Sequence, residues 1–231
     1  MLRNKLNRLL LPAVCLMALL AGLNPATAFQ DTHPLTGRQI AGVMGFGGAD
    51  WLVRPERESE EQPDKALDAL NLKPGMMVAD IGAGVGYMSL RMAKRVGPAG
   101  RVYANDLQPE MLQELRKNAA KAKLTNVETV LGEVADPKLP AGKMDLVLLV
   151  DVYHEFSQPQ QMLRKIHETL KPDGRLVLLE YRAEDPNVPI RPEHKMTVGQ
   201  VKTELEAEGF VLGPVIETLP RQHILILTKA R

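Results

Sequence analysis

The amino-acid sequence predicts an α/β fold with a doubly wound, mostly parallel sheet of seven strands. Segments of strand and helix character alternate strictly from Pro63 onward. The segments at 145–150 and 175–179 are almost continuously apolar, which is typical of central strands covered on both faces. Strict alternation implies right-handed crossovers, and ligands of such sheets bind at the carboxyl ends of the strands.

The individual elements follow from local patterns along residues 63–231. Pro74 and Gly75 turn the chain from the first helix into the first strand. The last two strands are joined through Pro220 and lie close enough in sequence to form an antiparallel hairpin. We expect helices at 63–72, 86–96 and 109–122, two further helices after 157 and 197, and strands at 76–81, 101–105, 127–131, 145–150, 175–179, 210–217 and 223–228.

The last two helices begin with capping-box patterns. Ser157 is followed by Gln160, and Thr197 by Gln200. In this pattern each side chain bonds the other residue's backbone N–H group, which satisfies donors that a helix start leaves free. Gly209 is expected to end the second of these helices.

The composition is that of an ordinary soluble domain with little net charge. Hydrophobic residues make up 45% and charged residues 25% of the chain. Lys and Arg number 29 against 28 Asp and Glu, a formal net charge of +1. Without a basic field we expect no nucleic-acid partner. The sequence indicates no oligomeric state.

The first residues have the pattern of a secretory signal. Three basic residues precede an apolar run at 9–23, and small residues at 26–28 resemble a cleavage site. We expect residues 1–28 to be a signal peptide and the protein to be exported, periplasmic or secreted, with membrane attachment only if the signal is retained. Cleavage would leave 26 basic and 28 acidic residues, a net charge of −2. It would also remove Cys15, the only cysteine, and with it any thiol chemistry.

Residues 29–62 read as an N-terminal appendage to the domain at 63–231. Glycines are frequent in it, and its apolar residues are too clustered for a free linker, so we expect it to pack on the domain. With Trp51 and Arg54 it could close over a ligand as a lid, or serve only as a strap.

The strongest local pattern is a glycine turn after the first predicted strand. Gly82, Gly84 and Gly86 follow Asp80, and such glycines let a backbone turn sharply and approach a ligand at the start of a helix. Asp106, at the end of the next strand, follows Gly86 by 20 positions, a spacing suited to binding ribose hydroxyls. The pattern is not the G-x-G-x-x-G of dinucleotide enzymes and favours a nucleoside without a pyrophosphate.

With these motifs the sequence resembles the class I S-adenosylmethionine-dependent methyltransferases. The resemblance spans residues 63–231 and keeps the family's motif order. It implies S-adenosylmethionine as cofactor, methyl transfer to a small-molecule or exposed O, N or C acceptor, and S-adenosylhomocysteine as product. The matching segments are the glycine motif at 80–86, the acidic motif at 105–107, the adenine region at 132–136, the fourth-strand motif at 145–156 and the turn into strand five at 171–176.

The resemblance assigns the methionine and ribose portions of the cofactor to the glycine turn. Gly82, Gly84 and Gly86 would contact these portions, and Asp106 would accept from both ribose hydroxyls. Asp80 would hold the glycine loop, or reach the cofactor's ammonium group through water.

The same resemblance assigns the adenine. Leu107 and Val134 would enclose it, although ordinary packing at strand ends explains both residues nearly as well. Family members commonly place an acid near adenine N6. Glu133 and Asp136 both fit, and we prefer Asp136.

Polar residues after the fourth strand are the candidates for catalysis. Methyl transfer needs alignment and, for an OH or NH acceptor, a base. His154 is our candidate base, because imidazole titrates near neutrality. Asp151 and Tyr153 stand beside it and could instead orient the methionine end of the cofactor. An equally good reading is that His154 or Glu155 only caps the next helix or orders the loop.

The loop at 182–196 is where this fold often builds its acceptor pocket. Arg191, His194 and Lys195 would give it a positive rim, although a solvated loop face is the commoner explanation. The five histidines show no metal-ligand spacing, so we expect no metal. His154 and Glu155 with Asp151 could bind a cation only if folding brings in further ligands.

Two other functions compete with methyl transfer. A nicotinamide-dependent oxidoreductase is disfavoured by the glycine spacing and by the absence of a Tyr-x-x-x-Lys pair. A domain that binds nucleosides or partners without catalysis is not excluded by the sequence. Export would favour this non-catalytic alternative, because S-adenosylmethionine is made in the cytosol and an exported protein would be separated from it.

Overall fold

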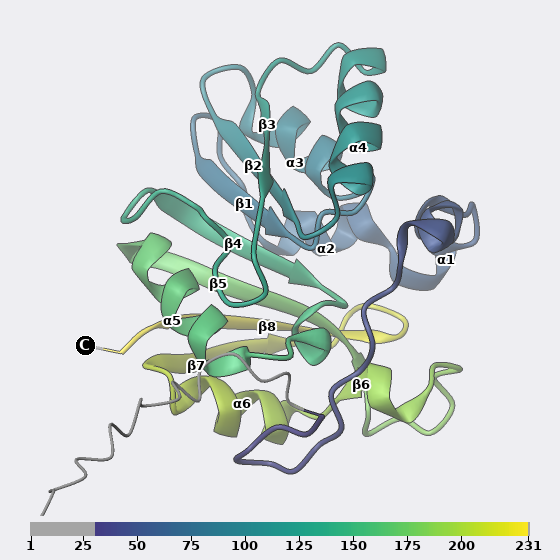
Figure 1. Ribbon diagram of the computed structural model, residues 1–231, viewed down its shortest axis with the longest axis vertical. Coiled ribbons are helices and arrows are strands. Elements are labelled where there is room, and N and C mark those ends of the chain that lie inside the picture. Colours follow the sequence, from purple (N-terminus) through teal and green to yellow (C-terminus); the bar gives the residue numbers. More distant parts are fainter. Residues whose placement is uncertain (1–30, 231) are drawn as a thin grey trace, which may run out of the picture.

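The computed structural model describes residues 31–230, so the predicted signal at 1–28 lies outside the described residues. One mixed sheet has the strand order β3-β2-β1-β4-β5-β8-β7, and a short β6 pairs with β5 (Figure 1). Strands β1 to β5 pair in parallel, while β8 is antiparallel to β5 and β7. The predicted doubly wound, mostly parallel fold is confirmed. The eighth strand, β6, has only two residues, too few for a hydrophobic period.

The helices and strands keep the predicted order. The strands are β1 Met77–Ile81, β2 Arg101–Asp106, β3 Val127–Leu131, β4 Met144–Val150, β5 Leu170–Arg182, β6 Lys195–Met196, β7 Phe210–Ile216 and β8 Gln222–Lys229. The α-helices are α1 Arg57–Glu61, α2 Pro63–Ala69, α3 Ser89–Val96, α4 Pro109–Lys121, α5 Pro159–Thr169 and α6 Val198–Glu206. Within residues 31–230 the 3-10 helices are η2 Phe46–Val53, η3 Tyr153–Glu155 and η4 Pro192–His194.

Two apolar clusters cover the two faces of the sheet. Successive residues of β4 alternate between them: Leu148 packs with α2 and α3, and Leu149 packs with α5 and α6. Both leucines are fully buried, and burial of one leucine side chain stabilises a fold by about 1.5–3 kcal/mol. Burial on both faces explains why the central strands are apolar without alternation.

The two predicted capping boxes have different outcomes. At α6 the Thr197 hydroxyl accepts from the Gln200 backbone N–H at 3.0 Å, and the Gln200 side chain accepts from the Thr197 N–H at 2.9 Å, so this box is confirmed. The box at Ser157 is wrong, because α5 begins at Pro159 with Gln158 as its N-cap and no side-chain cap. Proline fits the first helical position, where its missing N–H needs no partner.

The N-terminal segment crosses the carboxyl ends of the parallel strands, as Figure 1 shows in purple. The Arg38 guanidinium bonds Glu204 of α6 at 2.9 Å, and the Ala41 N–H donates to the His154 carbonyl at 3.1 Å. Further along, the Met44 carbonyl accepts from the Gln108 side chain at 2.9 Å. The expected packing of this segment on the domain is therefore observed. Within residues 31–230, no helix is both long and apolar enough to cross a bilayer.

Candidate functional site

A cavity of about 640 Å³ opens at the carboxyl ends of β1, β2 and β4. Its volume lies within the range of about 300–1,000 Å³ that small-molecule sites occupy. The loops after these strands line one side, and the N-terminal segment from Val43 to Arg57 lines another. The cavity therefore lies where doubly wound sheets bind their ligands.

The glycine turn forms one wall of this cavity. Gly82, Gly84 and Gly86 have φ angles of +73°, +54° and +96°, which L side chains rarely adopt. A Cβ atom on Gly82 would lie 2.4 Å from Cγ2 of Val152, across the cavity wall. Gly82 and Gly84 line the cavity, whereas Gly86 packs against Leu115 of α4. The positive φ at Gly86 also delays α3, which begins at Ser89 rather than at the predicted Gly86.

Asp106 holds this turn from the end of β2. One carboxylate oxygen accepts the Gly84 N–H at 2.8 Å, and the other accepts the Gln108 N–H at 2.9 Å. Burial raises the pKa of Asp106, and the backbone N–H groups of Gln108, Gly84 and Leu107 oppose that rise. Each oxygen keeps a second lone pair, and Asp106 lines the cavity, so it can still accept from a ligand's hydroxyl groups.

Asp80 lies beneath the turn, at the edge of the same cavity. Its carboxylate accepts from the Ser89 hydroxyl at 2.5 Å and is 2% exposed. Burial raises its pKa to about 6. Both roles weighed from the sequence fit this placement: Asp80 ties the turn to α3, and it also lines the cavity.

The predicted adenine residues separate into two groups. Leu107 and Val134 both line the cavity, and Leu107 is 38% exposed, so an apolar surface is open to a ligand there. Asp136 lies elsewhere: its carboxylate accepts the Lys138 backbone N–H at 2.7 Å and faces a second, shallow hollow. Neither Glu133 nor Asp136 lines the main cavity, so the structure does not bring Asp136 to the place expected for it. Glu133 and Asp136 pair in an isolated antiparallel bridge, and the Lys138 ammonium lies 3.2 and 3.4 Å from their two carboxylates.

His154, in η3 after β4, also lines the cavity and is 1% exposed. Its Nδ1 lies 2.6 Å from Oε2 of Glu180, and its Nε2 lies 3.1 Å from Nδ1 of His194. Burial alone would lower the pKa of His154, but the charge and hydrogen bond of Glu180 outweigh burial, and the pKa is raised. Burial, followed by the charge of His154, lowers the pKa of His194.

The other two candidates for catalysis differ in position. Asp151 lines the cavity with a φ of +53°, and Oδ2 accepts from the Gln222 side chain at 2.8 Å, while Oδ1 is buried without a hydrogen-bond partner. Burial, with the charges of Glu61 and Glu180, raises the pKa of Asp151 well above its usual value.

Tyr153 does not line the cavity, which corrects its assignment to the catalytic end. It is fully buried, and its hydroxyl donates to Glu204 at 2.8 Å on the α6 side of the sheet. The 3-10 turn η3 directs Tyr153 and His154 to opposite sides, so adjacency in sequence does not bring them together.

Comparison with known proteins identifies the family. A family model described as a methyltransferase domain matches residues 72–215, more than half of the chain. The chain belongs to the class I S-adenosylmethionine-dependent methyltransferases. The crystal structure of an S-adenosylmethionine-dependent methyltransferase from Aquifex aeolicus is similar, with a TM-score of 0.74 and 29% identity over 80% of this chain and 98% of that one.

Two similar curated proteins are matched over only part of their length. Nocamycin O-methyltransferase of Saccharothrix syringae is 33% identical over 61% of this chain, and arsenite methyltransferase of Halobacterium salinarum is 29% identical over 66%. The matched segments cover only 48% and 41% of those two proteins. The similarity therefore identifies the methyltransferase domain and leaves the acceptor of this methyltransferase open.

The cofactor of the family, S-adenosylmethionine, fits the residues of this cavity. Gly82 and Gly84 present bare backbone where a Cβ atom would collide with Val152 or Leu52. Asp106 has lone pairs for ribose hydroxyls, and Leu107 with Val134 offers an apolar slot. The buried Oδ1 of Asp151, which has no partner, suits a cationic group.

The structure adds site residues that the sequence analysis missed. Glu180, on β5, holds His154, and Leu52 and Arg57 of the N-terminal segment line the cavity. Arg57 bonds Glu61 at 2.7 Å, and Glu61 accepts from the Tyr181 hydroxyl at 2.9 Å. Glu180 directly follows the apolar residues 176–179 of the strand. A carboxylate buried in such a strand needs a partner, so the sequence did contain a sign that Glu180 belongs to a polar site. The contributions of Leu52 and Arg57 depend on how the chain crosses the sheet.

Proposed function

We propose that this methyltransferase transfers the methyl group of S-adenosylmethionine to a hydroxyl oxygen of a small molecule. The observation that supports this most is the pair formed by His154, which follows β4, and Glu180 of β5, whereas Leu107 follows β2 on the other side of β1. The Nδ1 proton donated to Glu180 makes Nε2 of His154 the basic nitrogen, and Nε2 can take a proton from an acceptor once His194 Nδ1, 3.1 Å away, turns aside. The similarity to an O-methyltransferase also favours oxygen.

When bound, S-adenosylmethionine supplies an electrophilic methyl group on a sulfonium and leaves as neutral S-adenosylhomocysteine. The residues of the chain align the partners and exclude water. Asp106 and the glycine turn bind the cofactor at one side of the cavity. Trp51 and Leu52 of the N-terminal segment line the cavity there and cover the cofactor. His154 receives the hydroxyl proton at Nε2 while the buried Glu180 carboxylate stabilises the imidazolium. Ile190, in the loop before β6, lines the same cavity, so we infer that the acceptor binds between this loop and the cofactor.

Two measurements test this proposal. The full chain is titrated in a calorimeter with S-adenosylmethionine, S-adenosylhomocysteine and NAD, and is then incubated with methyl-labelled cofactor and a panel of small hydroxyl compounds. We expect binding of the first two ligands only, and label in an ether product. Binding without transfer to any compound of this panel would contradict transfer to oxygen and favour the non-catalytic domain, and binding of NAD alone would favour the oxidoreductase.

The His154→Ala variant tests the assigned role. It should keep its affinity for S-adenosylmethionine and lose roughly 10²–10⁴-fold in turnover, the usual contribution of a general base. The His167→Ala variant, changed at a histidine outside the cavity lining, is the control. Full activity of the His154 variant would remove His154 from the mechanism.

We also propose that the protein is exported. The basic residues, apolar run and small residues of the first 28 positions support this, with the signal cleaved before Phe29. Cell fractionation followed by N-terminal sequencing tests it. A chain that begins at Phe29 outside the cytoplasm is expected, and a cytoplasmic chain that begins at Met1 would contradict the proposal.

A further inference from the structure

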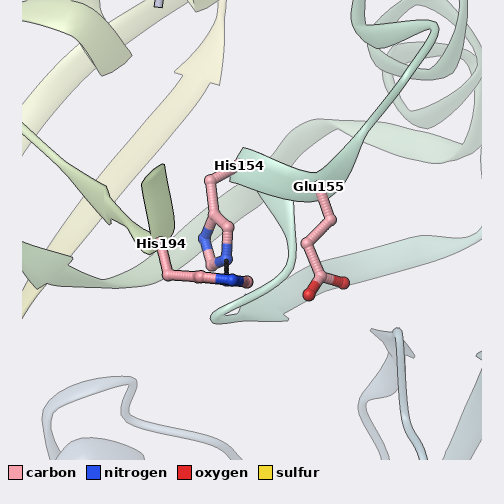
Figure 2. A group of neighbouring side chains, drawn as sticks. All are labelled: His154, Glu155 and His194. Carbon is pink, nitrogen blue, oxygen red and sulfur yellow. Dashed lines mark hydrogen bonds between the residues drawn. The ribbon is translucent and has the colours of Figure 1, made fainter. Parts of the chain in front are cut away.

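We propose that His154, His194 and Glu155 form a binding site for one divalent transition-metal ion, such as Zn²⁺, at the acceptor end of the cavity. Each of the three offers one ligand atom, and these atoms all lie within 4.8 Å of one another. Figure 2 shows His154 and Glu155 reaching from the turn after β4, and His194 from the segment before β6. Folding thus supplies the additional ligand that the spacing of the histidines in the sequence does not reveal.

The distances allow coordination after small side-chain rotations. Zinc binds histidine nitrogen and carboxylate oxygen at about 2.0–2.2 Å, so two of its ligand atoms are at most about 4.4 Å apart. His154 Nε2 and His194 Nδ1 are already 3.1 Å apart. His194 and Glu155 are partly exposed to the cavity, which leaves them room to rotate.

The surroundings of His154 are those of a metal ligand. Metal-binding histidines usually donate their second ring N–H to a carboxylate, which fixes the ring and its tautomer. Glu180 does this here: its Oε2 lies 2.6 Å from Nδ1 of His154, and its Oε1 accepts the Tyr153 N–H at 3.0 Å. Nε2 of His154 is therefore held toward the cavity.

The charge at this end of the cavity also favours a cation. Asp151, Glu155 and Glu180 bring three carboxylates together, and within residues 31–230 no hydrogen bond to the Glu155 carboxylate occurs. Arg57, which faces Asp151, is already paired with Glu61 at 2.7 Å. Arg191 is the opposing charge at the rim, and it is exposed to solvent.

Two histidines and one carboxylate leave coordination positions open for water or a substrate. An acceptor hydroxyl that binds the ion becomes more acidic, and its proton leaves to water as the metal–oxygen bond forms. In the metal-bound enzyme His154 is thus a ligand, and the ion takes over the activation of the acceptor. This role rests on the proposed function, whereas binding of the ion does not.

The test is calorimetric titration of the full chain, prepared without a histidine tag and freed of metal by a chelator, with ZnCl₂ and with CoCl₂. We expect one ion per chain, and visible absorption bands of bound Co²⁺ that show nitrogen and oxygen ligands. MgCl₂ should bind far more weakly, because Mg²⁺ prefers oxygen ligands only. Absence of one-to-one binding by the unchanged chain would overturn the inference.

Variants locate the ion. His194→Ala changes a half-buried residue at the cavity and should weaken binding at least tenfold, as should Glu155→Gln. Glu180→Gln should weaken it about 10–100-fold through the orientation of His154. The matched controls are Glu193→Gln, on the same turn as His194, and His167→Ala, and neither should change the affinity. Equal losses in the controls, or none at His194, would overturn the site.

A parallel titration with S-adenosylmethionine separates this inference from the proposed function. If the cofactor binds and Zn²⁺ does not, the metal site is wrong and the methyltransferase proposal stands. If Zn²⁺ binds and the cofactor does not, the metal site stands and the proposed function fails. Thermal unfolding of each variant shows whether a lost affinity reflects a lost fold.

Discussion

Asp106 both stabilises the glycine turn and lines the cavity. Its two carboxylate oxygens hold the N–H groups of Gly84 and Gln108, so the acid fixes the turn before any ligand arrives. The Asp106→Ala variant should therefore weaken binding of S-adenosylmethionine by about 1–3 kcal/mol, through the loss of charge-assisted hydrogen bonds. Calorimetry measures this, with Asp136→Ala as the control. A larger loss at Asp136 would return that residue to the adenine site.

Asp80 makes stability depend on pH. Its folded-state pKa is about 6 because of burial, above the usual value of 3.8, so between pH 4 and 6 the folded chain holds a proton that the unfolded chain has lost. Stability then falls as pH rises through this window. The Asp80→Asn variant keeps an acceptor for Ser89 without a buried charge. Relative to the unchanged protein it should gain on the order of 3 kcal/mol at pH 8 and almost nothing at pH 4. Urea unfolding at both pH values checks this, and an equal difference at the two would contradict it.

At the scale of elements, the turn between β1 and α3 depends on glycine for two separate reasons. Gly82 has a φ of +73°, and a Cβ atom there would also meet Val152. Gly142 has a φ of +64° with nothing within 4 Å, so Gly142→Ala tests the backbone cost alone, about 1–2 kcal/mol. Gly82→Ala should cost more than Gly142→Ala in denaturant unfolding, and Val152→Ala should recover part of the difference. Equal costs would mean that the contact with Val152 is unimportant.

The N-terminal segment contacts elements on both sides of the sheet order, Glu204 of α6 through Arg38 and Gln108 before α4 through Met44. Glu204 of α6 is fully buried and accepts from Arg38, Thr36 and Tyr153. Breaking a buried ion pair leaves one charge unpaired, which costs about 3–5 kcal/mol. Arg38→Met should therefore destabilise the protein by this amount in urea unfolding, and Arg38→Met with Glu204→Leu should be less destabilised than the single variant. Additive losses would show that the pair is not coupled.

At the scale of the whole molecule, the cavity is closed on one side by a segment far from it in sequence. Trp51 and Val53 are 43% and 47% exposed, and Leu52 reaches Gly84 beside the cavity. If this segment acts as a lid, cofactor binding should slow amide hydrogen exchange at residues 43–57 several-fold. Peptides from β3, at the far edge of the sheet, serve as the reference. Unchanged exchange at 43–57 would make the segment a strap only.

Local patterns in the sequence determined the order of the elements, the parallel sheet and the position of the glycine turn. These features depend on short-range properties: the period of apolar residues, the conformational freedom of glycine and the geometry of proline at helix starts. The contact between the glycine turn and Asp106 follows for the same reason, because the turn and the end of the next strand are adjacent in any parallel pair. Boundaries were less certain, as the later starts of α3 and α5 show.

The tertiary structure alone decided which side chains surround His154 in the cavity. It brings Glu180 and His194 to His154 from positions 26 and 40 residues away, and turns Tyr153 toward Glu204. It also directs Asp136 away from the main cavity, which the spacing of the acids could not show. Contacts between distant segments depend on strand order and on the path of the loops, which no local pattern encodes. The sequence by itself therefore specified the fold and the glycine turn beside Asp106, and folding specified which side chains surround His154.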